Sequence, residues 1–291
     1  MSGWKTVFHQ VKQGIASGLF PDICFSCNRF IEKDISGDSG KAPVDGKIPA
    51  PETSERIFRA VMAGYLCCFC MDDFVPVSPP ICPRCGAQFR SRAGSDHLCG
   101  RCIARDMPGS RTRRIPFVSA RAYGQYTGTL KNMIHAYKYH GKTGLGRPLG
   151  ALLHIHFARH YADASIDCII PVPLHREKLV KRGFDQVMGM LYHWPWTVAD
   201  GSRVLENGSA LSEKLLHRVK NTDTQTGLDR KRRSANVRNA FVVTDSERVK
   251  NKSVVLIDDV YTTGATLEEC ALAVERAGAR QVHCLTLARA M

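Results

Sequence analysis

Two adjacent carboxylates followed by a hydroxyl-rich turn carry the most specific chemistry in this chain. Asp258 and Asp259 come directly after the apolar run 254–257, and a predicted helix follows the turn. Adjacent carboxylates at the end of a strand are costly unless they bind hydroxyls or a cation. The turn offers three hydroxyls and a series of backbone N–H groups to a phosphate, and it consists of Thr262, Thr263, Gly264, Ala265 and Thr266.

Carboxylates for sugar hydroxyls and a cradle for a phosphate, a few residues apart, fit a ribose 5-phosphate. The alternative is a helix-capping threonine beside solvated acids. Capping needs one hydroxyl and no acid pair, so the sequence favours the ligand site.

Cysteines form the second group of residues with chemical potential. Eight of the twelve form C-x-x-C pairs, namely Cys24/Cys27, Cys67/Cys70, Cys82/Cys85 and Cys99/Cys102. Four such pairs favour tetrahedral zinc over disulfide or redox use, because each tight turn aims two thiolates at one ion. Sequential pairing would give two zinc sites, and crossed pairing remains open. We expect Cys68 to be a spare thiol and Cys168, Cys270 and Cys284 to be inert core residues.

The elements that must position these residues alternate between strand and helix. The patterns predict strands at 116–126, 166–170, 254–257 and 281–288, and helices at 130–139, 148–161, 184–192 and 265–278. This order predicts an α/β fold with a parallel sheet flanked by helices, which binds ligands at the carboxyl ends of its strands. We predict that His154, His156 and His160 are partly exposed helix residues and not metal ligands.

The N-terminal part has a different organisation. Residues 1–22 have the spacing of an amphipathic helix, and residues 34–56 read as a mobile insertion within a zinc module spanning 23–110. The sheet domain is expected at 115–291. We find neither a secretion signal nor an apolar run long enough to span a membrane, so we expect a cytoplasmic protein.

The net charge of +14 favours a partner that is polyanionic or carries phosphate. Residues 84–121 contain nine arginines and two acids, and residues 214–238 contain eight Lys or Arg and two acids. The second stretch could close over pyrophosphate, or bind single-stranded DNA without sequence preference, and the sequence leaves both open.

The phrase VVLIDDVYTTGAT resembles the motif that binds phosphoribosyl pyrophosphate (PRPP) in type I phosphoribosyltransferases. Further phrases, including FPDICFSC, CPRCG, AYKYHG and IIPVPLHREKLVKRGFDQ, resemble the ComF (ComFC) family of competence and DNA-uptake proteins in the family's order. The resemblance implies a zinc ribbon ahead of a phosphoribosyltransferase-like domain. Asp185 departs from the asparagine that is usual in the family's RGFNQ phrase.

The resemblance also implies roles for individual residues. Asp258 and Asp259 would be the catalytic acids that hold the ribose hydroxyls with Mg²⁺, and the 262–266 turn would hold the 5-phosphate. Val172 and Pro173 would belong to the pyrophosphate loop, and nearby positive charge would come from Arg176, Lys178, Lys181 and Arg182.

Two functions follow as expectations. The first is a Mg²⁺-dependent phosphoribosyltransferase that uses PRPP and an unidentified acceptor in DNA uptake. The alternative is a non-catalytic protein of transformation that handles single-stranded DNA, cooperates with competence or DNA-uptake proteins, and uses PRPP or nucleotide binding for regulation.

Overall fold

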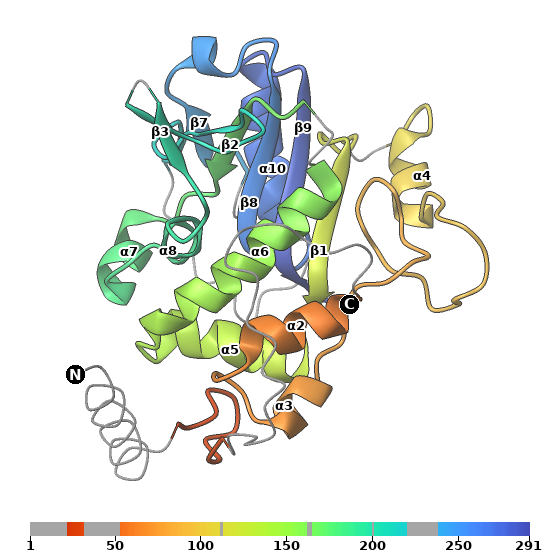
Figure 1. Ribbon diagram of the computed structural model, residues 1–291. Helices are drawn as coiled ribbons and strands as arrows, with labels where there is room; N and C mark the ends of the chain where they lie inside the picture. The colour runs from red at the N-terminus through yellow and green to blue at the C-terminus, as the bar shows by residue number, and fades with distance from the viewer. Residues whose placement is uncertain (1–21, 32–52, 111–112, 162–164, 200, 220–237) are drawn as a thin grey trace.

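The computed structural model (Figure 1) describes residues 22–31, 53–110, 113–161, 165–199, 201–219 and 238–291. Its main sheet has seven strands in the order β1-β9-β8-β2-β5-β4-β3. The first five in this order are parallel, and β4 and β3 add antiparallel pairs at one edge. The strands are β1 (Ser119–Gln125), β2 (Cys168–Pro171), β3 (Thr197–Ala199), β4 (Ser202–Val204), β5 (Ala210–Leu211), β8 (Ser253–Tyr261) and β9 (Gln281–Arg289). The predicted α/β class is confirmed.

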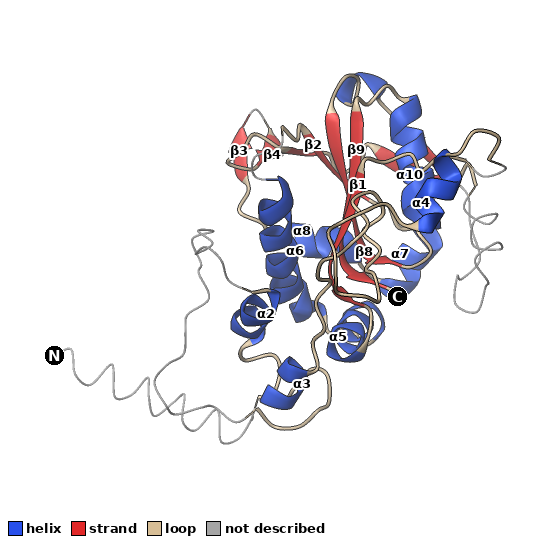
Figure 2. Cartoon of the chain, turned by 90° about the vertical axis from the view of Figure 1, so that its right-hand side faces the viewer, coloured by secondary structure: helices blue, strands red, loops and turns tan. Residues whose placement is uncertain are grey.

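Helices cover both faces of this sheet, as Figure 2 shows for α6 and α10 on opposite sides. One face carries α2 (Ser54–Met62), α5 (Gly128–Tyr139), α6 (Gly146–Tyr161) and α8 (Gln186–Leu191). The other carries α10 (Ala265–Arg276) and an antiparallel pair of strands, β6 (Leu216–Arg218) and β7 (Phe241–Val243). The shorter helices are α3 (Cys68–Asp72), α4 (Gly100–Asp106), α7 (Arg176–Arg182) and the 3-10 turns Thr143–Leu145 and Ser246–Arg248.

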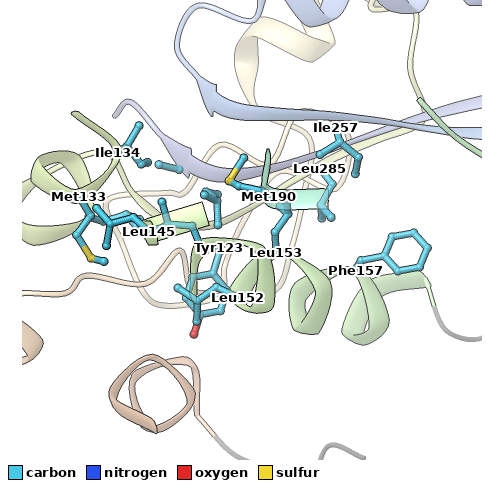
Figure 3. Packing of buried hydrophobic residues seen from close by; sticks show 14 of the residues in the cluster. Tyr123, Met133, Ile134, Leu145, Leu152, Leu153, Phe157, Met190, Ile257 and Leu285 are labelled. Atoms are coloured by element: carbon cyan, nitrogen blue, oxygen red, sulfur yellow. The ribbon is translucent and has the colours of Figure 1, made fainter. Parts of the chain in front are cut away.

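Strand β8 shows why the sheet is buried on both sides. Val255 and Ile257 pack in the hydrophobic cluster with α6 and α8, whereas Val254 and Leu256 pack in the cluster with α10. Successive side chains of a strand point to opposite faces, so a continuous apolar run is what a doubly covered strand requires. Each such side chain contributes about 1.5–3 kcal/mol when fully buried. Figure 3 shows Ile257 on the side of the sheet that carries apolar side chains of α6 and α8, such as Leu153 and Met190.

The cysteine-rich part of the chain lies on both faces of the sheet. Cys24 and Cys67 are buried in the cluster on the α6 face, while Cys82 and Cys85 are buried in the cluster on the α10 face. The connecting chain runs along edge strand β1, where the N–H of Val77 donates to the carbonyl of Tyr123 at 3.2 Å. The division into a module at 23–110 and a domain at 115–291 stays a prediction.

The predicted mobile insertion at 34–56 is wrong at its C-terminal end. Helix α2 begins at Ser54, and the hydroxyl of Thr53 accepts a hydrogen bond from the N–H of Arg56. The helix forms because Ile57 and Phe58 bury its apolar face, which the polar residues before them conceal in the sequence. Residues 32–52, and the amphipathic helix predicted at 1–22 apart from Asp22, lie outside the described residues.

Two further predictions are corrected. The apolar run 254–257 is only the first part of β8, since pairing with β9 continues to Asp258, opposite Thr286, and to Tyr261, opposite Arg289. The acids therefore belong to the last part of the strand. His156, a residue of α6, is buried, and burial holds its pKa well below the usual value. The helices in the described part of the chain are all too short or too polar to cross a membrane.

Candidate functional site

A pocket of about 560 Å³ lies at the carboxyl ends of β2 and β8. These strands are neighbours, with Pro171 paired to Ile257, so the segments that follow them meet at one edge of the sheet. Pockets of this size suit small-molecule ligands. Eight of the predicted site residues line it, namely Asp258, Asp259, Thr262, Gly264, Thr266, Val172, Pro173 and Arg182.

Three predicted residues do not line the pocket. Arg176 is exposed in the first turn of α7, while Lys178 and Lys181 of the same helix do line it. Thr263 and Ala265 belong to the turn itself, where the hydroxyl of Thr263 accepts a hydrogen bond from the N–H of Ala265 at 3.4 Å.

Asp259 is buried and forms an ion pair with a residue that the sequence analysis did not single out. Lys138, near the end of α5, places its ammonium 2.7 Å from the Asp259 carboxylate. Burial by itself lowers the pKa of Lys138, but the charge of Asp259 and this hydrogen bond outweigh it, so the pKa is raised. The pair supplies one positive charge to a site with two adjacent acids.

Asp258 has a different environment. Its carboxylate accepts the backbone N–H of Asp259 at 2.8 Å. Burial, followed by the charge of Asp259, raises the pKa of Asp258 to about 7, while Lys138 opposes the shift. A ligand that supplies hydroxyls or positive charge would stabilise the ionised form of this carboxyl.

The turn between β8 and α10 is closely packed. Gly264 has φ +83°, and a Cβ at this position would overlap the hydroxyl of Tyr261. Only glycine fits both the left-handed backbone and the close approach. Helix α10 begins directly after Gly264, so its positive end faces the pocket that Gly264 and Thr266 line.

Cations also line the pocket. Lys178 and Lys181 of α7 face the site together with Arg218 of β6. Burial, and then the charges of Arg218, Arg182 and Lys138, lower the pKa of Lys178. Cations this close repel one another, and a polyanion such as pyrophosphate would relieve the repulsion.

Sequence reasoning did not assign roles to several other residues of the pocket. Lys138 lies in the AYKYHG phrase, and this resemblance was the only feature of the sequence that could have pointed to it. Arg218 lies in the second basic stretch. Aromatic side chains also line the pocket, namely Tyr126, Tyr139, Phe184 and Tyr261.

Asp185 has a structural role that asparagine could also fill. Its carboxylate accepts the N–H groups of Val187 at 2.9 Å and Met188 at 3.0 Å, which caps the N-terminus of α8. Asparagine can cap a helix in the same way through its amide oxygen.

The cysteine pairs form two groups in the sequential arrangement, with the ligand atoms of each group within 4.8 Å of one another. The sulfurs of Cys27 and Cys67 are 3.6 Å apart, as are those of Cys82 and Cys102 and those of Cys85 and Cys99. A tetrahedron with Zn–S bonds of about 2.3 Å has edges of about 3.8 Å, so both groups fit zinc. The first four-cysteine group is Cys24, Cys27, Cys67 and Cys70, and the second is Cys82, Cys85, Cys99 and Cys102.

The remaining cysteines lie outside both groups. Cys68 is exposed, and the three isolated cysteines Cys168, Cys270 and Cys284 are buried.

Four arginines of the first basic stretch form ion pairs that the sequence does not reveal. Arg101 and Arg105 pair with Glu268, Arg113 pairs with Glu269 and Arg114 pairs with Glu275. The acids all belong to α10, so these arginines dock the second four-cysteine group on that helix. Of the second basic stretch, residues 220–237 lie outside the described residues.

Comparison with known proteins agrees with this architecture. Residues 203–291 match the phosphoribosyl transferase domain family. The chain is 30% identical to the DNA utilization protein YhgH of Salmonella typhi over 218 residues, which cover 72% of this chain and 85% of that protein. It is 29% identical to competence protein F of Haemophilus influenzae with the same coverage, and 23% identical to competence protein ComFC of Bacillus subtilis over 77% of this chain and 84% of that protein. With its phosphoribosyltransferase-type sheet and two four-cysteine groups, the chain belongs to the ComF (ComFC) family.

Proposed function

We propose that this protein binds PRPP with Mg²⁺ in the pocket at the ends of β2 and β8 and transfers its phosphoribosyl group to an acceptor during DNA uptake. One observation carries the proposal. The acid pair, the glycine-containing turn and the cations of α7 all line the same pocket. Each is complementary to a different part of PRPP.

Different residues of the pocket are suited to different parts of the ligand. Asp258 and Asp259 are suited to the ribose 2- and 3-hydroxyls, and the turn at 262–266 is suited to the 5-phosphate at the N-terminus of α10. Lys178, Lys181 and Arg182 surround the end of β2, where Val172 and Pro173 form the pyrophosphate side. Asp258 and Asp259 would also hold Mg²⁺, which would supply positive charge to offset that of pyrophosphate.

The transfer step follows from this placement. The bond between ribose C1 and the pyrophosphate oxygen breaks, and the electron pair leaves with pyrophosphate. The acceptor atom forms a new bond to C1 and releases its proton to water. The cations of α7 stabilise the charge that develops on the leaving group.

Calorimetric titration with PRPP and Mg²⁺ tests binding. The double variant Asp258→Asn/Asp259→Asn should lose it, because the hydroxyl and metal partners are removed. The matched control Glu206→Gln/Glu247→Gln removes two exposed carboxylates outside the pocket and should bind like the wild type. Unchanged affinity in the Asn variant would refute the site. Pyrophosphate release, measured with each nucleobase and with DNA, tests transfer.

The names of the relatives favour a second candidate, since they describe competence and DNA utilization proteins. In this role the protein handles single-stranded DNA in the cytoplasm, together with other competence proteins, and PRPP binding regulates it without catalysis. PRPP binding with no pyrophosphate release for any acceptor, combined with DNA binding, would favour this candidate over the transferase.

A further inference from the structure

We propose that Arg101 is a positioning residue that couples the second four-cysteine group to the phosphate-binding turn. The inference rests on the proposed function, because it assumes that the turn at 262–266 holds the phosphate. It adds that the metal site controls the shape and the charge of this turn.

Arg101 connects the two sites directly. It lies in α4 between Cys99 and Cys102, two of the four cysteines of this group. Its Nη1 donates to the backbone carbonyl of Thr263 at 3.3 Å, inside the turn. Its guanidinium also pairs with Glu268 in the first turn of α10. A shift of α4 would therefore move both contacts.

The contact with Thr263 determines where an adjacent N–H points. In a trans peptide the carbonyl of one residue and the N–H of the next point in opposite directions. With the Thr263 carbonyl held toward Arg101, the N–H of Gly264 points away from Arg101. Gly264 lines the pocket, so this orientation suits a phosphate there.

The contact with Glu268 acts on charge. A carboxylate in the first turn of α10 lies close to the position proposed for the phosphate, and two anions repel each other. Arg101 and Arg105 both pair with Glu268, the latter at 2.9 Å, and neutralise that carboxylate. Without Arg101, the Thr263 carbonyl would lose the hydrogen bond that fixes its orientation. The charge of Glu268 would also be less fully neutralised.

A second connection approaches the turn from the other half of the second four-cysteine group. Arg289 donates to the carbonyl of Cys85 at 2.6 Å, and its guanidinium lies 4.1 Å from the ring centroid of Tyr261. Tyr261 in turn contacts Gly264. Both C-x-x-C turns of this group are thus joined to the phosphate turn through an arginine.

Coupling of this kind is reciprocal. Metal bound to the second four-cysteine group should strengthen phosphate binding, and a phosphate in the turn should slow the loss of that metal. The first four-cysteine group lies on the other face of the sheet and should show neither effect.

The test compares Arg101→Met with Arg101→Lys and with the matched control Arg114→Met. Arg114 pairs with Glu275 near the other end of the same helix. Arg101→Met should bind PRPP and ribose 5-phosphate about tenfold more weakly, as expected for the loss of a charged hydrogen bond. Arg101→Lys should recover part of the affinity, and Arg114→Met should match the wild type. Zinc content and thermal stability are measured on each variant.

Wild-type affinity in an Arg101→Met protein that holds zinc, or an equal loss in Arg114→Met, would overturn the inference. If Arg101→Met does not fold or hold zinc, the test is made on the wild-type protein, by measuring the rate at which a chelator removes its zinc. Ribose 5-phosphate should then slow chelator-driven release of one zinc and leave the other unchanged. Equal release with and without a ligand that binds would overturn the coupling. A wild type that binds neither ligand would instead refute the proposed function.

Discussion

The ammonium of Lys138 lies 2.7 Å from the carboxylate of Asp259, across 121 positions of sequence. The ion pair joins the end of α5 to the end of β8, and both side chains are largely buried. Two adjacent acids at the end of a buried strand would otherwise carry a large desolvation cost. The positive charge of Lys138 thus offsets part of this cost in the protein without a ligand.

Replacing Lys138 should therefore destabilise the fold. Lys138→Met leaves Asp259 buried without its partner, and we expect the free energy of unfolding to fall by about 3 kcal/mol. Urea denaturation measures this free energy of unfolding. Lys178→Met is the control, because Lys178 faces the same pocket among other cations and its loss relieves repulsion. Equal stability of the two variants would contradict the role of Lys138.

The raised pKa of Asp258 predicts a pH dependence of stability. Its pKa is about 7 in the folded protein, against about 3.9 for an unfolded aspartate. Between these values the folded state binds more protons, so stability falls as the pH rises through this range and the loss is complete above about 7. Asp258→Asn cannot ionise and should be spared this loss.

Urea unfolding of both proteins at about pH 5.5 to 8 provides the measurement. The difference in unfolding free energy should shift in favour of Asp258→Asn as the pH rises. Parallel curves would mean that Asp258 is not perturbed in the folded state.

Metal analysis should find two zinc ions per chain. Cys24→Ser and Cys82→Ser should each lose one, because they belong to different groups. Cys68→Ser is the matched control, since Cys68 is exposed beside Cys67 and belongs to neither group. Structural zinc contributes on the order of 10 kcal/mol to folding in apparent terms, so each loss should be strongly destabilising. A metal-free protein with its cysteines oxidised in pairs would refute both sites.

The ion pairs of α10 also predict which basic stretch could bind DNA. Anisotropy with labelled single-stranded oligonucleotides should show affinity falling with salt, with a logarithmic slope of about −0.7 per phosphate neutralised. Replacing Arg230, Lys231, Arg232 and Arg233 by Gln should flatten that slope for every sequence. Arg113→Gln/Arg114→Gln should not, because these arginines are paired with Glu269 and Glu275. Absence of binding at low salt would end the DNA proposal.

Local patterns in the sequence were enough to predict much of this protein. The apolar run before Asp258 and the helical spacing after Gly264 predicted β8 and α10, because strand and helix periodicities depend on near neighbours. The four C-x-x-C pairs predicted metal sites, since each pair is a local turn. The start of α2 at Ser54 was missed: its main local signal is the Thr53 cap, and burial of Ile57 and Phe58 supplies the tertiary part of its stability.

Tertiary structure alone decided the contacts between distant segments. It paired Lys138 with Asp259, placed the two four-cysteine groups on opposite faces of the sheet, and paired four arginines of 84–121 with acids of α10. The charge count of a segment includes only the acids within that segment, so it could not reveal partners more than 150 positions away. Ion pairs depend on distance in space, and only the folded chain brings these charges together.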